Sequence, residues 1–253
     1  MSENTNEIVF AIYIGTGIFL FLLLFSFVII YNYIKIKITK EKEILEAVFN
    51  TAESERNRIA DDLHDSLGSN IAVLKMYNES LLLQHVSDEA VKTLQKNSEI
   101  IDKAIQEIHM ICRNQSGKFI TDNGIVHELE YLQKSVAGLI TLKIKNVNQL
   151  PSTLIPGFTI NLFRIVQELL QNAIKHSRCK TVIIDFHLTD SQFIFSFKDD
   201  GIGMSSSKAK DRSGMKNIAG RAKIFDGQHE IILLDKEGTT HLFVFPLNKI
   251  IVV

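Results

Sequence analysis

The stretch ERNRIADDLHDSLG, residues 55–68, lies within a long apolar repeat that sets the architecture of the first half of the chain. Apolar residues on both sides of it recur about every three or four positions, as along the seam between packed helices. The repeat consists of Leu45, Val48, Ala52 and Ile59, followed by Ala60, Leu63, Leu67, Asn70, Leu74, Tyr77 and Leu81. The two series differ in phase by one residue, which predicts a local change in helix rotation just ahead of His64.

A second helix is predicted after a break at residues 86–88, where Ser87 or Asp88 is a suitable N-cap. Its seam positions also alternate by three and four: Val91, Leu94, Ser98, Ile101, Ile105, Ile108 and Cys112. Two antiparallel helices with one apolar stripe each bury too little surface alone, and a second copy of the chain is the simplest remedy. We therefore expect residues 55–117 to form an all-α, dimeric four-helix bundle.

His64 is the candidate reactive residue of this bundle. It follows the seam residue Leu63 and lies about 100° around the helix from it, at the solvent edge. A lone surface histidine is usually inert, so the neighbouring residues of 55–68 are what make His64 a candidate.

The amino-terminal segment predicts a membrane anchor. Residues 8–34 contain no charged side chain, and about 20 apolar residues suffice to cross a bilayer as a helix. A cleaved signal peptide is the alternative, but it needs a preceding Lys or Arg, a shorter apolar core and a small-residue cleavage site. We therefore expect a single transmembrane helix over 8–34.

The charges beside this helix predict its orientation. Residues 1–7 carry no Lys or Arg, whereas four lysines follow the helix: Lys35, Lys37, Lys40 and Lys42. The positive-inside rule then places the chain in the cytoplasmic membrane as a single-pass protein with its N-terminus outside. An extracytoplasmic tail of residues 1–7 is too short to fold into a ligand-binding domain. A signal is expected through the bilayer, a membrane partner or a cytoplasmic sensor partner, carried on by a signalling helix over 35–54.

Composition excludes several classes of protein. The 253 residues have a formal net charge of -1, which gives no field for holding nucleic acid. The two cysteines, Cys112 and Cys179, lack the spacing of a disulfide framework or a zinc site. The chain has no Trp and only 3 Pro, which favours long helices.

Residues 118–253 show mixed periodicity and predict an α+β domain. Helices are expected over 124–139, 158–177 and 214–225, and a strand over 141–147. Two hairpins are expected from TVIIDFHLTD with QFIFSFKDD and from HEIILLD with THLFVFPL, the second turning at residues 236–238. Residues 205–208, between a glycine motif and a helix start, are expected to form a mobile loop over a site.

Three short motifs in this domain carry polar residues. Glu168, Asn172, Lys175 and His176 share one face of a helix, although a solvated face would also explain them. The DDGIG motif follows a strand, although an ordinary turn would also explain it; its members of interest are Asp199, Gly201 and Gly203. The last motif, SGMKNI at 213–218, begins a helix whose free N–H groups suit a phosphate.

Taken in order, with Gly238 and Thr239, these motifs resemble those of the ATPase fold shared by histidine kinases, Hsp90, gyrase B and MutL. The stretch 55–68 resembles the phosphoacceptor motif of the nitrate-sensor and lipid-sensor branch of bacterial two-component sensor histidine kinases. The Walker and protein-kinase motifs are absent from the sequence. The resemblance covers residues 55–253 and implies an α+β sandwich that binds ATP.

The resemblance also implies a role for each motif residue. His64 would be phosphorylated, Asp65 would assist it, and Glu168 would polarise the site around the transferred phosphate. Asn172 would ligate Mg²⁺. The implied nucleotide contacts are Asp199 to the adenine amino group, Gly201 and Gly203 along the pocket, Lys175 with the amides of Gly214 and Met215 to phosphates, and Thr239 behind the adenine.

The function implied is a membrane-anchored, ATP-dependent protein-histidine kinase that passes its phosphoryl group to a separate cytoplasmic response regulator. A separate partner is expected because these parts account for all 253 residues. The alternative is a non-catalytic, dimeric membrane scaffold that binds ATP. One departure stands out: the family branch usually has Gln five residues after the histidine, and here that residue is Ser69.

Overall fold

The computed structural model describes residues 2–84, 87–203, 213–233 and 238–252. The chain divides into two compact units, Met1–Ala47 and Val48–Val253. Helix α1 extends over Ser2–Leu63. Among the described residues, one helical stretch, Gly15–Leu82, is long and apolar enough to cross a membrane, and none of its most apolar window is buried in the protein. An unburied apolar helix supports the membrane anchor expected at 8–34 without establishing its topology.

A π-helical turn, His64–Gly68, joins α1 to helix α2, Ser69–Leu82. A π-turn contains an extra residue and therefore rotates the following side chains around the axis. The predicted change of rotation is thus present, but it begins at His64 rather than ahead of it. Ser69 supports the turn, because its hydroxyl donates to the backbone carbonyls of Asp65 and Ser66.

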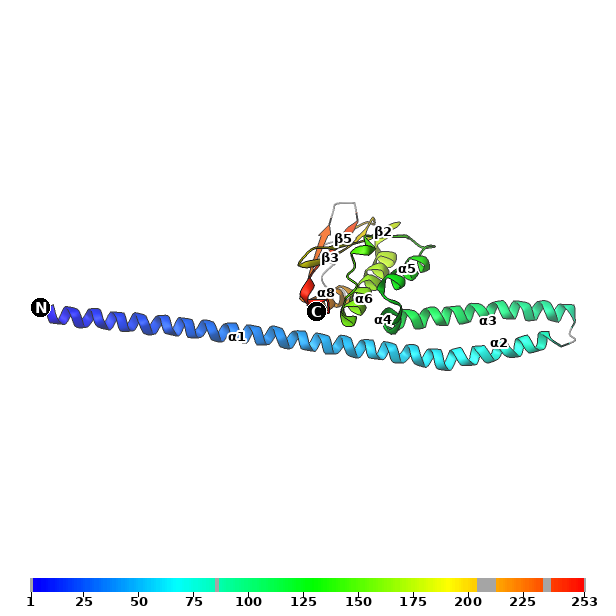
Figure 1. Cartoon of the computed structure of the whole chain (residues 1–253), viewed down its shortest axis with the longest axis horizontal. Helices are drawn as coiled ribbons and strands as arrows, with labels where there is room; N and C mark the ends of the chain where they lie inside the picture. Colours follow the sequence, from blue (N-terminus) through cyan, green and yellow to red (C-terminus); the bar gives the residue numbers. More distant parts are fainter. Residues whose placement is uncertain (1, 85–86, 204–212, 234–237, 253) are drawn as a thin grey trace. The chain divides into compact units, whose positions relative to one another are not determined.

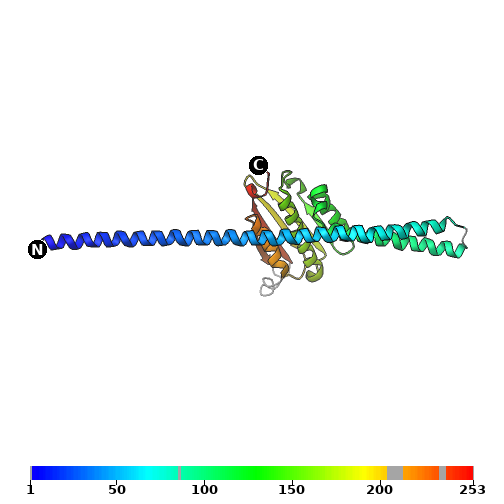
Figure 2. The same cartoon turned by 90° about the horizontal axis from the view of Figure 1, so that it is seen from below.

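Helix α3, Asp88–Gln115, begins at the predicted N-cap Ser87, whose hydroxyl accepts the Ala90 N–H, and lies beside α2 in both views (Figures 1 and 2). The predicted seam of α3 is buried or half-buried along its whole length. The side chain of Asn78 on α2 is buried and donates to the Leu94 carbonyl at 2.9 Å and to Ser98 Oγ at 2.7 Å. The stripe predicted on α2 is instead exposed in the single chain at Leu67, Leu74, Tyr77 and Leu81.

The carboxy-terminal domain is one five-stranded sheet with helices. The helices are α4 (Lys118–Asn123), α5 (Ile125–Ser135), α6 (Pro156–Asn172) and α8 (Ser213–Ile224). The strands are β1 (Thr141–Lys145), β2 (Thr181–Leu188), β3 (Gln192–Asp199), β4 (Gln228–Leu233) and β5 (Thr239–Pro246). A π-turn over Ala173–Ser177 and 3-10 turns at Val147–Gln149 and Leu247–Lys249 complete the domain.

The sheet confirms both predicted hairpins. Its strand order is β1-β2-β3-β5-β4, with β1 parallel to β2 and all other neighbours antiparallel. The helix expected at 124–139 ends at Ser135, the helix expected at 158–177 becomes π-helical from Ala173, and α4 was not predicted. The expected loop at 205–208 and turn residues 236 and 237 lie outside the described residues.

The core lies between the sheet and its helices. Side chains of β2, β3 and β5 alternate between buried and less buried positions, as expected for a sheet with one face covered. In Figure 1, α6 and α8 lie on one side of this sheet. Phenylalanines dominate the buried face: Phe158, Phe186, Phe193, Phe195, Phe197, Phe243 and Phe245.

We expect Phe195→Ala to destabilise this domain by about 3–5 kcal/mol, because the ring is fully buried beside Phe186 and Phe243 and its loss leaves a cavity. Urea unfolding of the full chain measures the change. Leu139→Ala is the matched control, since Leu139 is largely exposed and should have little effect. Equal stability of the two variants would contradict this assignment of the core.

Candidate functional site

The buried face of the sheet changes from aromatic to polar at one end of β3 and β5. The inward residues of the two strands pair as Phe195 with Phe243, Phe197 with His241, and Asp199 with Thr239. The alternation of the strands therefore places Asp199, Thr239 and His241 on the same face as the aromatic core. These three residues line a cavity of about 370 Å³, which we call the Asp199 cavity.

Helix α6, its π-turn and the start of α8 supply most of the rest of this cavity, and β3 with the segment after it supplies Phe197 and Gly203. Its lining includes seven further polar or glycine positions and five apolar or small ones: Glu168, Gln171, Asn172, Lys175, His176, Gly203, Gly214, Leu169, Ala173, Ser177, Phe197 and Met215. Every nucleotide-contact residue expected from the sequence therefore lies at one cavity, except Gly201. The π-turn carries Lys175 and His176, and such turns are frequent at functional sites.

Asp199 is the buried acid of the cavity. It is 4% exposed, and its Oδ1 accepts the Gly201 N–H at 2.9 Å. Burial raises the pKa of Asp199, whereas the Gly201 amide and Ser177 act in the opposite direction. Asp200 instead accepts the backbone N–H groups of Lys180 and Thr181 at 2.7 and 2.9 Å. Of the two adjacent acids, only Asp199 lines the cavity.

At two positions near the cavity, close contacts leave no room for a side chain larger than that of glycine. A Cβ at Gly201 would collide with the Ser177 carbonyl oxygen, so this position lies behind Asp199 and supports it. A Cβ at Gly214 would collide with Glu168 Oε1, and Asn172 Nδ2 would lie 3.7 Å away. The start of α8 therefore lies against the two polar residues of α6.

His241 also lines the cavity, although the sequence motifs predict no role for it. It is 3% exposed, and its Nδ1 lies 3.0 Å from His229 Nε2. Burial and the neighbouring His229 lower the pKa of His241 to about 3, and burial lowers that of His229 to about 4. The pair is neutral at physiological pH. The alternation of β5, counted from Thr239, is the signal that could have found it.

His64 and Asp65 lie apart from the Asp199 cavity. The His64 side chain is 65% exposed, and its Nδ1 lies 3.4 Å from Asp65 Oδ1. Its ring stacks near His109, with centroids 6.1 Å apart, and both histidines line the same two shallow hollows. The sequence motifs predict no role for His109 either. The Nδ1 contact leaves Nε2 open to a reaction partner.

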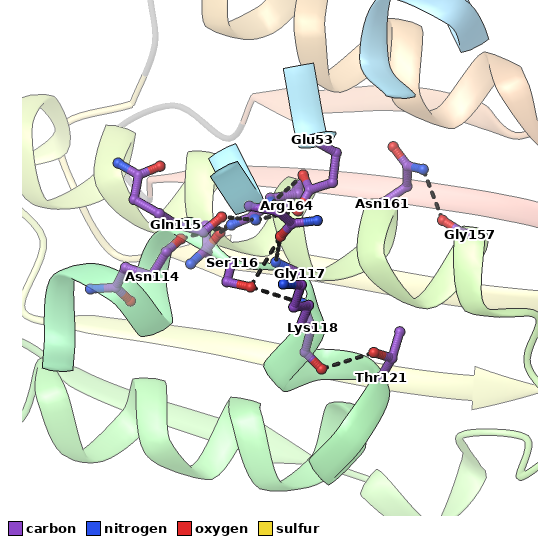
Figure 3. A network of polar contacts seen from close by, with 12 residues as sticks. Glu53, Asn114, Gln115, Ser116, Gly117, Lys118, Thr121, Gly157, Asn161 and Arg164 are labelled. Atoms are coloured by element: carbon purple, nitrogen blue, oxygen red, sulfur yellow. Dashed lines mark hydrogen bonds and ion pairs between the residues drawn. The ribbon is translucent and has the colours of Figure 1, made fainter. Parts of the chain in front are cut away.

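A polar network joins the end of α1 to the carboxy-terminal domain (Figure 3). The Arg164 guanidinium on α6 donates to both Glu53 carboxylate oxygens, at 2.5 and 3.0 Å. It also donates to the Asn114 and Gln115 carbonyls at 2.8 and 2.6 Å and to Gln167 Oε1 at 2.7 Å. Arg164 is only 3% exposed.

The same face of α1 contacts the segment that connects α3 to α4. Asn57 Oδ1 accepts from Ser116 Oγ at 3.0 Å and from the Gly117 N–H at 2.9 Å. Lys118 Nζ donates to Asp61 Oδ2 at 2.6 Å. We call these contacts, together with Glu53 and Arg164, the α1 docking network. It fixes where the carboxy-terminal domain lies along the last turns of α1.

Comparisons with known proteins agree with this architecture. Residues 55–115 match the family "Histidine kinase", and residues 157–248 match "Histidine kinase-, DNA gyrase B-, and HSP90-like ATPase". The two matches together support a sensor histidine kinase that combines a helix pair with an ATPase domain.

Curated relatives carry the same description. The chain is 27% identical over 202 residues to sensor histidine kinase ComP of Bacillus subtilis (strain 168), covering 76% of this chain and 26% of ComP. It is 28% identical over 207 residues to LiaS of the same strain, covering 77% and 56% of the two chains. It is 25% identical over 204 residues to sensor protein VraS of Staphylococcus saprophyticus, covering 78% and 57%. The matched region is thus between a quarter and three fifths of each relative.

We expect Glu53→Gln to release the α1 docking network, because it removes the carboxylate that pairs with the buried Arg164. The loss of about 3 kcal/mol should speed amide exchange of Gly117 by roughly a hundredfold. Hydrogen exchange and mass spectrometry of a peptide over 114–118 measures this.

Glu55→Gln is the matched control for this experiment. Glu55 is exposed, lies two residues further along α1 and pairs only with its neighbour Arg58. It should leave exchange at 114–118 unchanged. Unchanged exchange in Glu53→Gln as well would show that the ion pair does not hold the domain.

Proposed function

We propose that the chain is a membrane-anchored sensor histidine kinase that phosphorylates His64 from Mg-ATP and passes the phosphoryl group to an aspartate of a separate response regulator. One observation carries this proposal. A single cavity gathers an acid, an amide and a cation from α6 and β3 next to a helix start, in a chain that also exposes a His-Asp pair. The two family matches support the same reaction class.

The Asp199 cavity suits a nucleotide. The buried Asp199 carboxylate accepts a hydrogen bond from the adenine amino group, with Gly201 and Gly203 beside it and Thr239 behind the base. The remaining polar groups suit phosphates. Lys175 and the amides of Gly214 and Met215 bind phosphate oxygens at the start of α8.

Asn172 and Glu168 fit a magnesium site, because both line the cavity and their side chains contain an amide and a carboxylate oxygen ligand. Mg²⁺ prefers oxygen ligands and is commonly completed by substrate phosphates. When bound, the ion neutralises charge that develops on the transferred phosphoryl group. In our proposal Asn172 holds the ion, and Glu168 polarises the site around the transferred phosphate.

His64 supplies the nucleophile in this proposal. The Nε2 lone pair of the imidazole attacks the γ-phosphorus, the bond to the ADP oxygen breaks, and ADP leaves with that electron pair. The proton on Nδ1 faces Asp65, which stabilises the positive charge that the ring gains. Because His64 does not line the Asp199 cavity, the ATPase domain must leave the α1 docking network to deliver the phosphate.

Dimerisation is proposed from the exposed stripe of α2. Leu67, Leu74, Tyr77 and Leu81 are apolar and uncovered in one chain, and a second copy would bury them in a four-helix bundle. We retain the domain bounds as proposals: an extracytoplasmic tail over 1–7, a membrane span over 8–34, a signalling helix over 35–54, a phosphoacceptor domain over 55–117 and an ATP-binding domain over 118–253.

The direct test incubates the full chain in detergent or lipid nanodiscs with Mg²⁺ and ATP labelled on the γ-phosphate. We expect acid-labile label on the protein, no label in His64→Ala, and unchanged ATP binding in that variant, because acceptor and nucleotide site are separate. Asn172→Ala should lose the label with His64 intact. ATP binding by the unaltered chain without any label would favour the non-catalytic scaffold instead.

Ser69 generates a second prediction. Its hydroxyl is engaged by the Asp65 and Ser66 carbonyls, so it is poorly placed to orient a water for dephosphorylating the regulator. We expect Ser69→Gln to speed loss of phosphate from the phosphorylated regulator several-fold, with autophosphorylation little changed. Ser69→Ala is the control for loss of the π-turn contacts. Rapid dephosphorylation by the unaltered chain, with no gain from glutamine, would contradict this prediction.

A further inference from the structure

A second cavity adjoins the Asp199 cavity. It has a volume of about 530 Å³ and shares three lining residues, Glu168, Gln171 and Lys175, with its neighbour. Three arginines from three different helices also line it: Arg56 of α1, Arg164 of α6 and Arg221 of α8. We call it the arginine cavity. The two cavities meet at Glu168 on α6 and Lys175 on the π-turn that follows it.

The arginine cavity has an excess of positive charge. It is lined by three arginines and one lysine but only one acid, Glu168, and the nearby Glu53 is taken up by Arg164. Arg221 donates to Asn161 Oδ1 at 2.7 Å and stacks over the Phe49 ring. Burial, with the like charges of Arg164 and Arg56, lowers the pKa of Arg221 to about 10. Cations held this close in a partly dry volume favour an anion between them.

Arg56 lies within the electrostatic influence of Glu53 and Glu168 but bonds directly to neither carboxylate. It is half-buried at the cavity wall, and within the described part of the chain its guanidinium forms no hydrogen bond or ion pair. Arg58, two residues further along α1, differs from Arg56 in both exposure and pairing. It is exposed and bonds Glu55 and Asp62. Among the described residues, the exposed Arg58 therefore forms ion pairs, whereas the half-buried Arg56 keeps its N–H donors available.

We propose that the arginine cavity binds the terminal phosphate of a nucleoside triphosphate and that Arg56 binds the γ-phosphate. The inference rests on the proposed function, which places the base at Asp199 in the adjoining cavity. A triphosphate that starts from there passes Asn172 and Lys175 and enters the arginine cavity where the two meet. The planar guanidinium of arginine matches the oxygens of a phosphate.

If Arg56 binds the γ-phosphate, the contact between the ATPase domain and α1 depends on which nucleotide is bound. Arg56 precedes His64 by eight residues on the same helix, a rise of about 12 Å. The docked domain thus holds the γ-phosphate at Arg56, on the same helix as His64 but too far from His64 for transfer. ATP strengthens docking because it reaches Arg56, whereas ADP lacks the phosphate that does so.

The test compares the affinities of the full chain for ATP and ADP, with Mg²⁺, by isothermal titration in nanodiscs. We expect Arg56→Ala to weaken ATP binding about tenfold and to change ADP binding less than twofold, because a charge-assisted bond is lost only with the triphosphate. Arg56→Lys should recover part of the loss, and Arg58→Ala should bind both nucleotides as the unaltered chain does. Circular dichroism verifies that each variant is folded.

Three results would overturn the inference. Unchanged ATP affinity in Arg56→Ala would show that Arg56 does not contact the γ-phosphate. An equal loss for ATP and ADP would assign Arg56 to a general structural role. Failure of the unaltered chain to bind either nucleotide would overturn the proposed function, and this inference with it.

Discussion

The buried guanidinium of Arg164 connects three parts of the chain that are distant in sequence. A guanidinium has five N–H donors, and Arg164 makes five hydrogen bonds: two to Glu53, one each to the Asn114 and Gln115 carbonyls, and one to Gln167. An unpaired charge at this depth would cost several kcal/mol, so all these partners must be present together. The end of α1, the end of α3 and α6 are therefore held in one arrangement.

This constraint determines what the two candidate sites are able to do. The docked ATPase domain presents its cavities to α1 at Arg56, while His64 lies further along the helix among α3 residues. In the proposed kinase, phosphoryl transfer requires the ion pair of Arg164 to open. Glu53 lies on the helix that continues from the apolar amino-terminal segment, so a rotation of α1 would move Glu53 directly. The same pair thus provides a route for a signal to reach the ATPase domain.

Local patterns predicted most of the carboxy-terminal domain. Alternation within the strands and the turn residues between them predicted both hairpins. Only the resemblance grouped Asp199 and Thr239 with the helix residues Glu168 and Asn172. The resemblance of the motifs supplied their expected roles. His241 was missed although the same alternation points it inward. Helix α4 was missed because its six residues are too short for a helical period to show.

Other features have no local signal. Glu53 and Arg164 are 111 residues apart, and nothing near either residue indicates its partner. The π-turns that begin at His64 and Ala173 rotate the residues that follow them around the helix axis. A regular helical period therefore assigns those residues to the wrong face. Asn78 explains why the apolar stripe on α2 is exposed. Its hydrogen bonds to Leu94 and Ser98 show that a different face of α2 packs against α3.

The most direct test of this account measures the distance between the helical hairpin and the ATPase domain. Spin labels at two exposed positions, Lys96 on α3 and Asp190 between β2 and β3, report it by double electron–electron resonance in the full chain. The account predicts one narrow distance distribution for the unaltered chain and a broad, shifted one when Arg164 loses Glu53. A broad distribution in the unaltered chain, or an identical narrow one in both proteins, would contradict the claim that this ion pair holds the domain.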